Sequence, residues 1–176
     1  MEVMLDLETF STKNNACILI IAGVKFNRNE PHKKIEDMDT IYLKVDSESC
    51  KKLGMDVDSK TVEWWNNMNS HCKKEIFSTD RENIKQCLLK FSQWFGNSEK
   101  IWSHGATFDI PILGDAYNRC GLEVPWKYWN SRDTRTLFEI ANIKVKDLPQ
   151  ENMHNALYDC WRQVWGVKES FKKIKN

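Results

Sequence analysis

An apolar run near the start of the chain constrains the fold more than any other feature. It extends from Cys17 to Phe26 and is rich in β-branched residues. A strand with one wet face alternates apolar and polar residues, whereas a strand covered on both faces is a continuous apolar run. Gly23 and Lys25 interrupt the run, which is shorter than the roughly 20 apolar residues of a spanning helix. The sequence therefore predicts an inner strand and no membrane span.

Two further strands are predicted on either side of this run. The side chains of residues 3–8 alternate between two faces, so Asp6 and Glu8 share one of them. Residues 40–45 have the composition of a third strand, and three strands at short spacing indicate an antiparallel meander. The first strand of this meander carries two carboxylates on one face.

Helices and short strands are predicted over the rest of the chain. The expected elements are two or three short helices in 47–77, a helix with capping-box spacing at Thr79–Glu82 that ends at Gly96, a strand over 100–103, a helix from near Phe108 to Gly121, a strand over 126–132 and a helix from near Asn155. This order predicts an α/β fold, a mixed sheet flanked by helices, in a single domain over residues 1–176.

Composition and charge argue against several classes of protein for this chain. The formal net charge of +1 excludes a protein that is held to nucleic acid by its global charge, so any such partner must be bound locally. The six cysteines are too far apart for a CxxC zinc or redox pair, and we expect reduced thiols in the core. The acidic first residues do not have the features of a secretory signal, which predicts a cytoplasmic protein.

Carboxylates recur at three widely separated places in the chain. Asp6 and Glu8 end the first strand, Asp109 opens a helix, and Asp159 follows His154 by five residues. Four acids gathered in one cleft would repel each other unless cations were present, and oxygen ligands suit Mg²⁺ or Mn²⁺. Two such ions are the usual device for displacement at a phosphodiester, with a histidine available to deprotonate the attacking water.

The residues Asp6-Leu7-Glu8-Thr9, His104 to Asp109 and His154-x-Ala156-x-x-Asp159 resemble the three motifs of the DEDDh, DnaQ-like exonucleases. The resemblance covers residues 1–165. The segments Asp6 to Ser11, Thr61 to Trp65 and Ser131 to Asp133 are similar to the small phage exonuclease A and RNase AS-type group. The resemblance implies an RNase H-like fold and a 3′-5′ exonuclease that releases nucleoside 5′-monophosphates from single-stranded RNA or DNA. It also implies two divalent ions and a possible homodimer.

The resemblance also implies roles for individual residues. Asp6 would bridge both metal ions, Glu8 and Asp159 would complete the first site, and Asp109 would hold the second ion largely through water. His154 would be the general base.

Three further residues beside the acids are expected to bind substrate. Thr9 would contact the terminal nucleotide through its backbone, and Phe10 would act as a base-stacking wedge. Phe108 completes the expected substrate-binding set.

Other readings of the same residues remain open at this point. An acid pair ends many strands, Asp109 could stabilise the start of its helix, and Asp159 could be an ion-pair partner of Arg162 or Arg135. A catalytically silent nucleic-acid binding module and a partner-activated subunit of a replication or repair complex are the alternative functions. Trp64 and Trp65 could stack on bases, but adjacent helical residues cannot both face one site, so at least one belongs to the core.

Overall fold

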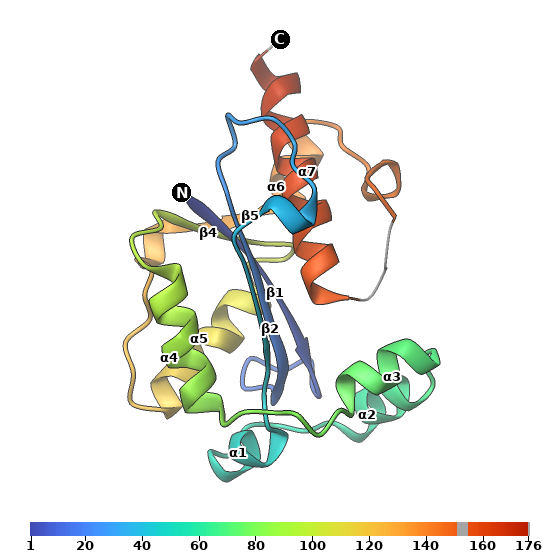
Figure 1. The fold of residues 1–176 in the computed structure, drawn as a ribbon, viewed down its shortest axis with the longest axis vertical. Coiled ribbons are helices and arrows are strands. Elements are labelled where there is room, and N and C mark those ends of the chain that lie inside the picture. Colours follow the sequence, from blue (N-terminus) through green and yellow to red (C-terminus); the bar gives the residue numbers. More distant parts are fainter. Residues whose placement is uncertain (151–154, 176) are drawn as a thin grey trace.

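The computed structural model describes residues 1–150 and 155–175 and is built on a mixed five-stranded sheet (Figure 1). The strand order is β3-β2-β1-β4-β5. The first three strands pair antiparallel, whereas β4 pairs parallel with β1 and β5 pairs parallel with β4. The predicted meander and the predicted mixed sheet are confirmed. The strand bounds are Glu2–Thr9 (β1), Ile18–Phe26 (β2), Thr40–Lys44 (β3), Lys100–Ser103 (β4) and Ser131–Asp133 (β5).

Helices cover both faces of the sheet. Figure 1 shows α4 and α5 on one side of it and α6 and α7 on the other. Their bounds are Ser47–Lys52 (α1), Ser59–Asn66 (α2), Ser70–Ile76 (α3), Ile84–Phe95 (α4), Asp109–Arg119 (α5), Thr134–Ile140 (α6) and Ala156–Lys175 (α7). Among the described residues, no helix is both long and apolar enough to cross a membrane.

The core forms where the apolar run predicts it. Every residue of β2 is buried except Lys25, because α7 packs across β1 and β2 on one face and α4 and α5 cover the other side. The six cysteines are free, and all but Cys120 are buried. The expectation of an inner strand and reduced core thiols is thus confirmed.

The start of α4 differs from the expected capping box. The helix begins at Ile84, and the side chain of Asn83 caps it by accepting from the backbone N–H of Lys85. Glu82 is unavailable as a helical residue because its backbone bonds to Lys44 and Asp46 at the end of β3. A tertiary backbone pairing therefore moves the helix start beyond the local sequence signal.

The last strand is shorter than predicted. Residues 128–130 form a 3₁₀ turn, and the strand covers only Ser131–Asp133. The turn is closed by a bond from the backbone N–H of Asn130 to the carbonyl of Lys127 (2.8 Å). The extended region predicted over 126–132 is therefore mostly a connection.

Candidate active site

The far half of β1 is open on one edge because β4 is short. β4 pairs only with Glu2, Val3 and Met4, so the strand continues past its parallel neighbour. Beyond that point Asp109, the first residue of α5, takes the place of a strand: its Oδ1 accepts from the backbone N–H of Leu7 (3.2 Å). A cleft at the carboxyl end of β1 follows from this difference in strand length.

Three of the predicted acids converge in this cleft. Asp6 and Glu8 lie on one face of β1, and Asp159 reaches them from the first turn of α7. One carboxylate oxygen from each of the three lies within 4.8 Å of the others. The amide Nε2 of Gln163, one turn further along α7, donates to Asp6 Oδ1 (3.2 Å). Packing of α7 across the sheet thus joins residues that are more than 150 positions apart.

Asp109 lies outside this trio but lines the same cavity. The cavity has a volume of about 470 Å³. Its lining combines carboxylates, cationic side chains and an apolar wall: Asp6, Leu7, Glu8, His104, Phe108, Asp109, Arg135, Phe138, Val145, Leu148, Asp159, Arg162 and Gln163. The structure therefore brings all four predicted acids to one cavity, three of them in direct proximity.

Burial raises the pKa of three of these acids, Asp6, Glu8 and Asp109. Burial raises the pKa of Glu8 to about 8, and repulsion from Asp109 adds to the effect. Burial likewise raises the pKa of Asp109 to about 7. The pKa of Asp6 is raised well above its ordinary value by burial and then by the charges of Asp109 and Glu8. These pKa values are raised because a negative charge is costly in a region of low dielectric constant when no positive charge compensates it.

The donor set fits a hard divalent cation. The converging atoms are all carboxylate oxygens, which Mg²⁺ and Mn²⁺ prefer, and the described part of the cleft contains no thiolate donor. A cation would also remove the repulsion that raises the pKa values of these acids. The chemistry of the residues present is therefore that of a metal centre.

A second, more apolar pocket adjoins the acidic cavity. It has a volume of about 390 Å³ and shares Leu7, Glu8 and Phe108 with the first. Its other lining residues come from the end of β1, the following loop and α2: Thr9, Ser11, Thr12, Lys60, Thr61, Trp64 and Trp65. The two pockets form one continuous surface around the last residues of β1.

The two adjacent tryptophans of α2 have different environments. Trp65 is buried, and its Nε1 donates to the carbonyl of Thr9 (2.9 Å). Trp64 is 48% exposed, and both tryptophans line the apolar pocket, so the expectation that the two cannot face one site is wrong. The expectation that at least one of the pair belongs to the core is confirmed.

A stacking role does not fit Phe10. Its side chain is only 8% exposed, its ring lies 6.1 Å from that of Phe77, and it is not among the described lining residues of either pocket. The register of β1 against β2 shifts between Glu8 and Thr9, and this irregularity changes the alternation of the side chains that follow. Thr9 and Phe108, in contrast, line the pockets as expected.

His154, the predicted base, lies outside the described residues. His104 has no metal-ligand spacing in the sequence, but its ring lines the acidic cavity and its Nδ1 is 2.8 Å from Thr134 Oγ1. Arg162 and Gln163 are two further cavity residues for which the sequence predicts no functional role. Their spacing from Asp159, three and four residues along one helix, is the signal that places them beside it.

Comparisons with known proteins agree with this geometry. The family model of the 3′-5′ exoribonuclease Rv2179c-like domain matches residues 1–171. A curated relative, the exodeoxyribonuclease of Enterobacteria phage T4, is 26% identical over 208 aligned positions, which cover 97% of this chain and 89% of the phage protein.

Solved structures share the fold. Exonuclease X in complex with 5′ overhanging duplex DNA superposes with a TM-score of 0.60 at 17% identity, over 98% of this chain and 92% of that one. The cell-death related nuclease 4 (CRN-4) gives a TM-score of 0.53 at 11% identity, over 97% and 63% of the two chains. The RNase H-like fold is thereby confirmed. The chain belongs to the 3′-5′ exoribonuclease Rv2179c-like family and is a DEDDh, DnaQ-like 3′-5′ exonuclease with the divalent-metal dependence of that family.

Proposed function

We propose that this exonuclease removes nucleotides one at a time from the 3′ end of single-stranded RNA or DNA and releases nucleoside 5′-monophosphates. The observation that carries the proposal is the convergence of Asp6, Glu8 and Asp159 within 4.8 Å, in a cavity that Asp109 also lines. The family supports the reaction, and the oxygen-only donor set supports Mg²⁺ or Mn²⁺ as its cofactor.

The four acids have separate parts in this proposal. Glu8 and Asp159 would hold one of two divalent ions, Asp109 would hold the other, and Asp6 would serve both. The place of Asp109 in the same cavity, outside the trio, supports a second ligand position there. When bound, the ions stabilise the attacking and leaving oxygens of the phosphodiester. The backbone N–H of Leu7 fixes the orientation of Asp109 toward the cleft.

His154 is the proposed general base. It precedes Asp159 by five residues, and in this role it accepts a proton from the attacking water. Water attacks the terminal phosphorus, the bond to the 3′ oxygen of the preceding nucleotide breaks, and that oxygen takes up a proton. The products are a nucleoside 5′-monophosphate and a chain shorter by one unit.

The apolar pocket is the proposed binding place for the terminal base. Phe108 lines both pockets, so a base there would lie directly beside the acids, and the exposed ring of Trp64 offers a stacking surface. Stacking of one base on an aromatic side chain is worth about 1–3 kcal/mol. We assign stacking to these two rings, and a polar contact to Thr9.

The sugar preference and the setting of the enzyme stay predictions. The matching family is described as an exoribonuclease, whereas the phage relative is named an exodeoxyribonuclease, so both nucleic acids belong in the test. A cytoplasmic location and a homodimer are likewise predictions. Light scattering of the purified chain tests the homodimer directly.

The test is digestion of 5′-labelled single-stranded RNA and DNA, each with a free or a blocked 3′ end. Reactions contain Mg²⁺, Mn²⁺ or a chelator, and the products are resolved on a gel. We expect stepwise shortening of free 3′ ends only, and only with a divalent ion. Shortening of blocked ends, or no shortening by folded protein with Mn²⁺, would contradict the proposal.

A further inference from the structure

Arg162 occupies an unusual place beside the acids. It lies one turn after Asp159 on α7, and its guanidinium forms an ion pair with the Asp159 carboxylate. Both side chains are largely shielded from water, with 12% and 17% of their surfaces exposed. Shielding from water strengthens the direct attraction between the two charges, and it also raises the cost of leaving either charge without a partner.

The guanidinium acts on more than one acid. Arg162 lines the acidic cavity together with Asp6, and its charge lowers the pKa of the Asp6 carboxyl. It therefore supplies, without any metal ion, part of the positive charge that the four carboxylates require. Asp159 is the acid to which this charge is bound directly.

A divalent ion and Arg162 compete for that carboxylate. Asp159 belongs to the trio whose oxygens converge within 4.8 Å, so a cation at the trio would lie close to the guanidinium. Two positive groups at such a distance repel each other, and the repulsion is strong where water is scarce. A cation at the trio would therefore weaken the attraction between Arg162 and Asp159.

We infer that Arg162 alternates between two anions: the Asp159 carboxylate in the metal-free enzyme and a phosphate oxygen of the substrate in the loaded one. A guanidinium that stays in the cleft after leaving Asp159 is well suited to phosphate, because its planar donors match phosphate oxygens. Arg162 is thus both a competitor of the metal ion and a substrate-positioning residue. The inference rests on the metal site of the proposed function.

Calorimetric titration of substrate-free protein with Mn²⁺ tests the competition. Arg162→Gln keeps length and polarity but removes the charge, and we expect it to bind Mn²⁺ about tenfold more tightly than the wild type. Arg162→Lys keeps the charge without the planar fork, and its affinity should lie between the two. Circular dichroism shows whether each variant is folded, and if Arg162→Gln is not, the lysine variant alone decides.

Arg135→Gln is the matched control. Arg135 lines the same cavity but lies against the Gly105 loop, where its guanidinium carbon is 3.3 Å from the position of an added Cβ. Its removal lowers the positive charge of the cleft without breaking the pair to Asp159. We expect a gain in Mn²⁺ affinity well below that of Arg162→Gln. Equal gains in the two variants, or an unchanged affinity in Arg162→Gln, would overturn the inference.

The second arm measures substrate use at saturating Mn²⁺. We expect Arg162→Gln to raise KM for an oligonucleotide about tenfold, as for the loss of one charge-assisted hydrogen bond. An unchanged KM would overturn the phosphate half of the inference. Wild-type protein that binds no Mn²⁺, or Asp6→Asn that binds it as tightly as the wild type, would instead refute the metal site of the proposed function.

Discussion

Asp6 lies among other acids in the cleft. Its carboxyl is close to two other acids, and burial and repulsion raise its pKa well above the ordinary value. A charge held in such a place destabilises the fold when no cation is bound. The residue at the centre of the proposed chemistry therefore lowers the stability of the metal-free protein.

Asp6→Asn should consequently make the metal-free protein more stable. We expect Tm to rise by about 3 °C, the shift that about 1 kcal/mol produces in a chain of this size. Asp80→Asn is the matched control, because Asp80 is exposed, pairs with Lys44 and is not among the described residues that line either pocket. Differential scanning calorimetry with a chelator gives both values. A lower Tm in Asp6→Asn would show that other groups already compensate the charge of the Asp6 carboxylate.

The pKa values of Glu8 and Asp109 predict a dependence of stability on pH. The folded-state values, about 8 and about 7, lie above the unfolded values of roughly 4.3 and 3.9. The stabilising protonation is thus complete below the unfolded pKa and is lost as the pH rises through the folded pKa. We expect the urea midpoint of metal-free protein to fall between about pH 4 and 8, and to fall less with saturating Mn²⁺. The same slope with and without Mn²⁺ would contradict this.

The sequence was sufficient to predict the acids but not all their neighbours. Asp6, Glu8 and Asp159 converge as expected because strand alternation and helix periodicity fix the faces of their elements. The sequence does not show that Phe10 is buried, because the register shift after Glu8 depends on pairing with β2. Arg162 could be placed beside Asp159 by helical spacing, but not in the cavity, because its burial depends on the packing of α7.

Helix α7, which carries Asp159, packs closely on α6. At Gly166 there is no room for a further side-chain atom. A Cβ added to Gly166 would lie 2.8 Å from Cε1 of Phe138, a residue of α6 that also lines the acidic cavity. Overpacking of this kind forces the elements apart. The glycine is therefore needed for the close approach of two helices and not for a turn.

Gly166→Ala should destabilise the protein by about 1–3 kcal/mol. Gly114→Ala on α5 is the control: nothing lies within 4 Å of an added Cβ there, so we expect a gain of about 0.5–1 kcal/mol from helix propensity. Urea denaturation of the two variants measures the contrast. Equal effects would show that α7 does not pack as described.

Elements were predicted well where a local pattern agreed with the tertiary contacts. The apolar periodicity of α4 is buried as expected, but its start moved to Ile84 because the backbone of Glu82 pairs at the end of β3. The length of β4, which opens the cleft, also has no local signal. It is fixed by where the chain turns toward α5 after Ser103.

The whole molecule combines an antiparallel half, which forms the core, with a short parallel half, which ends early and leaves the cleft. Alternation of strand and helix along the sequence was sufficient for the fold class. The parallel strands β1, β4 and β5 run in one direction, so their starts lie at the end of the sheet away from the cleft. Exposed aromatic residues at the cleft end of the sheet are therefore expected to bind substrate, whereas those at the other end are not.

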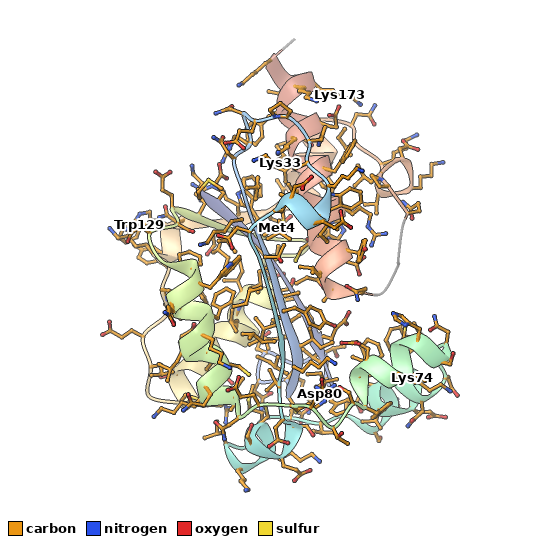
Figure 2. The ribbon with its side chains drawn as sticks, viewed as in Figure 1. Met4, Lys33, Lys74, Asp80, Trp129 and Lys173 are labelled. Atoms are coloured by element: carbon orange, nitrogen blue, oxygen red, sulfur yellow. The ribbon has the colours of Figure 1, made fainter. Side chains whose placement is uncertain are left out.

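Trp64→Ala should weaken substrate binding, whereas Trp129→Ala should not. Trp64 lines the pocket beside the acids and belongs to α2, which packs on α3. Trp129 is 57% exposed and precedes β5. Figure 2 shows Trp129 on the opposite side of the molecule from Lys74 of α3. We expect about tenfold weaker binding of a single-stranded oligonucleotide for Trp64→Ala, from the loss of one stacked base. Fluorescence anisotropy with a labelled oligonucleotide measures both, and equal losses would argue against the apolar pocket as the base site.

Single-turnover digestion shows whether the acids at the end of β1 carry the exonuclease reaction. Wild type, Asp6→Asn and Asp80→Asn are each mixed with a 5′-labelled oligonucleotide that the wild type shortens, at saturating Mn²⁺ or with a chelator. We expect shortening by the wild type and Asp80→Asn with Mn²⁺ only, and none by folded Asp6→Asn. Shortening by Asp6→Asn at the wild-type rate would contradict this expectation.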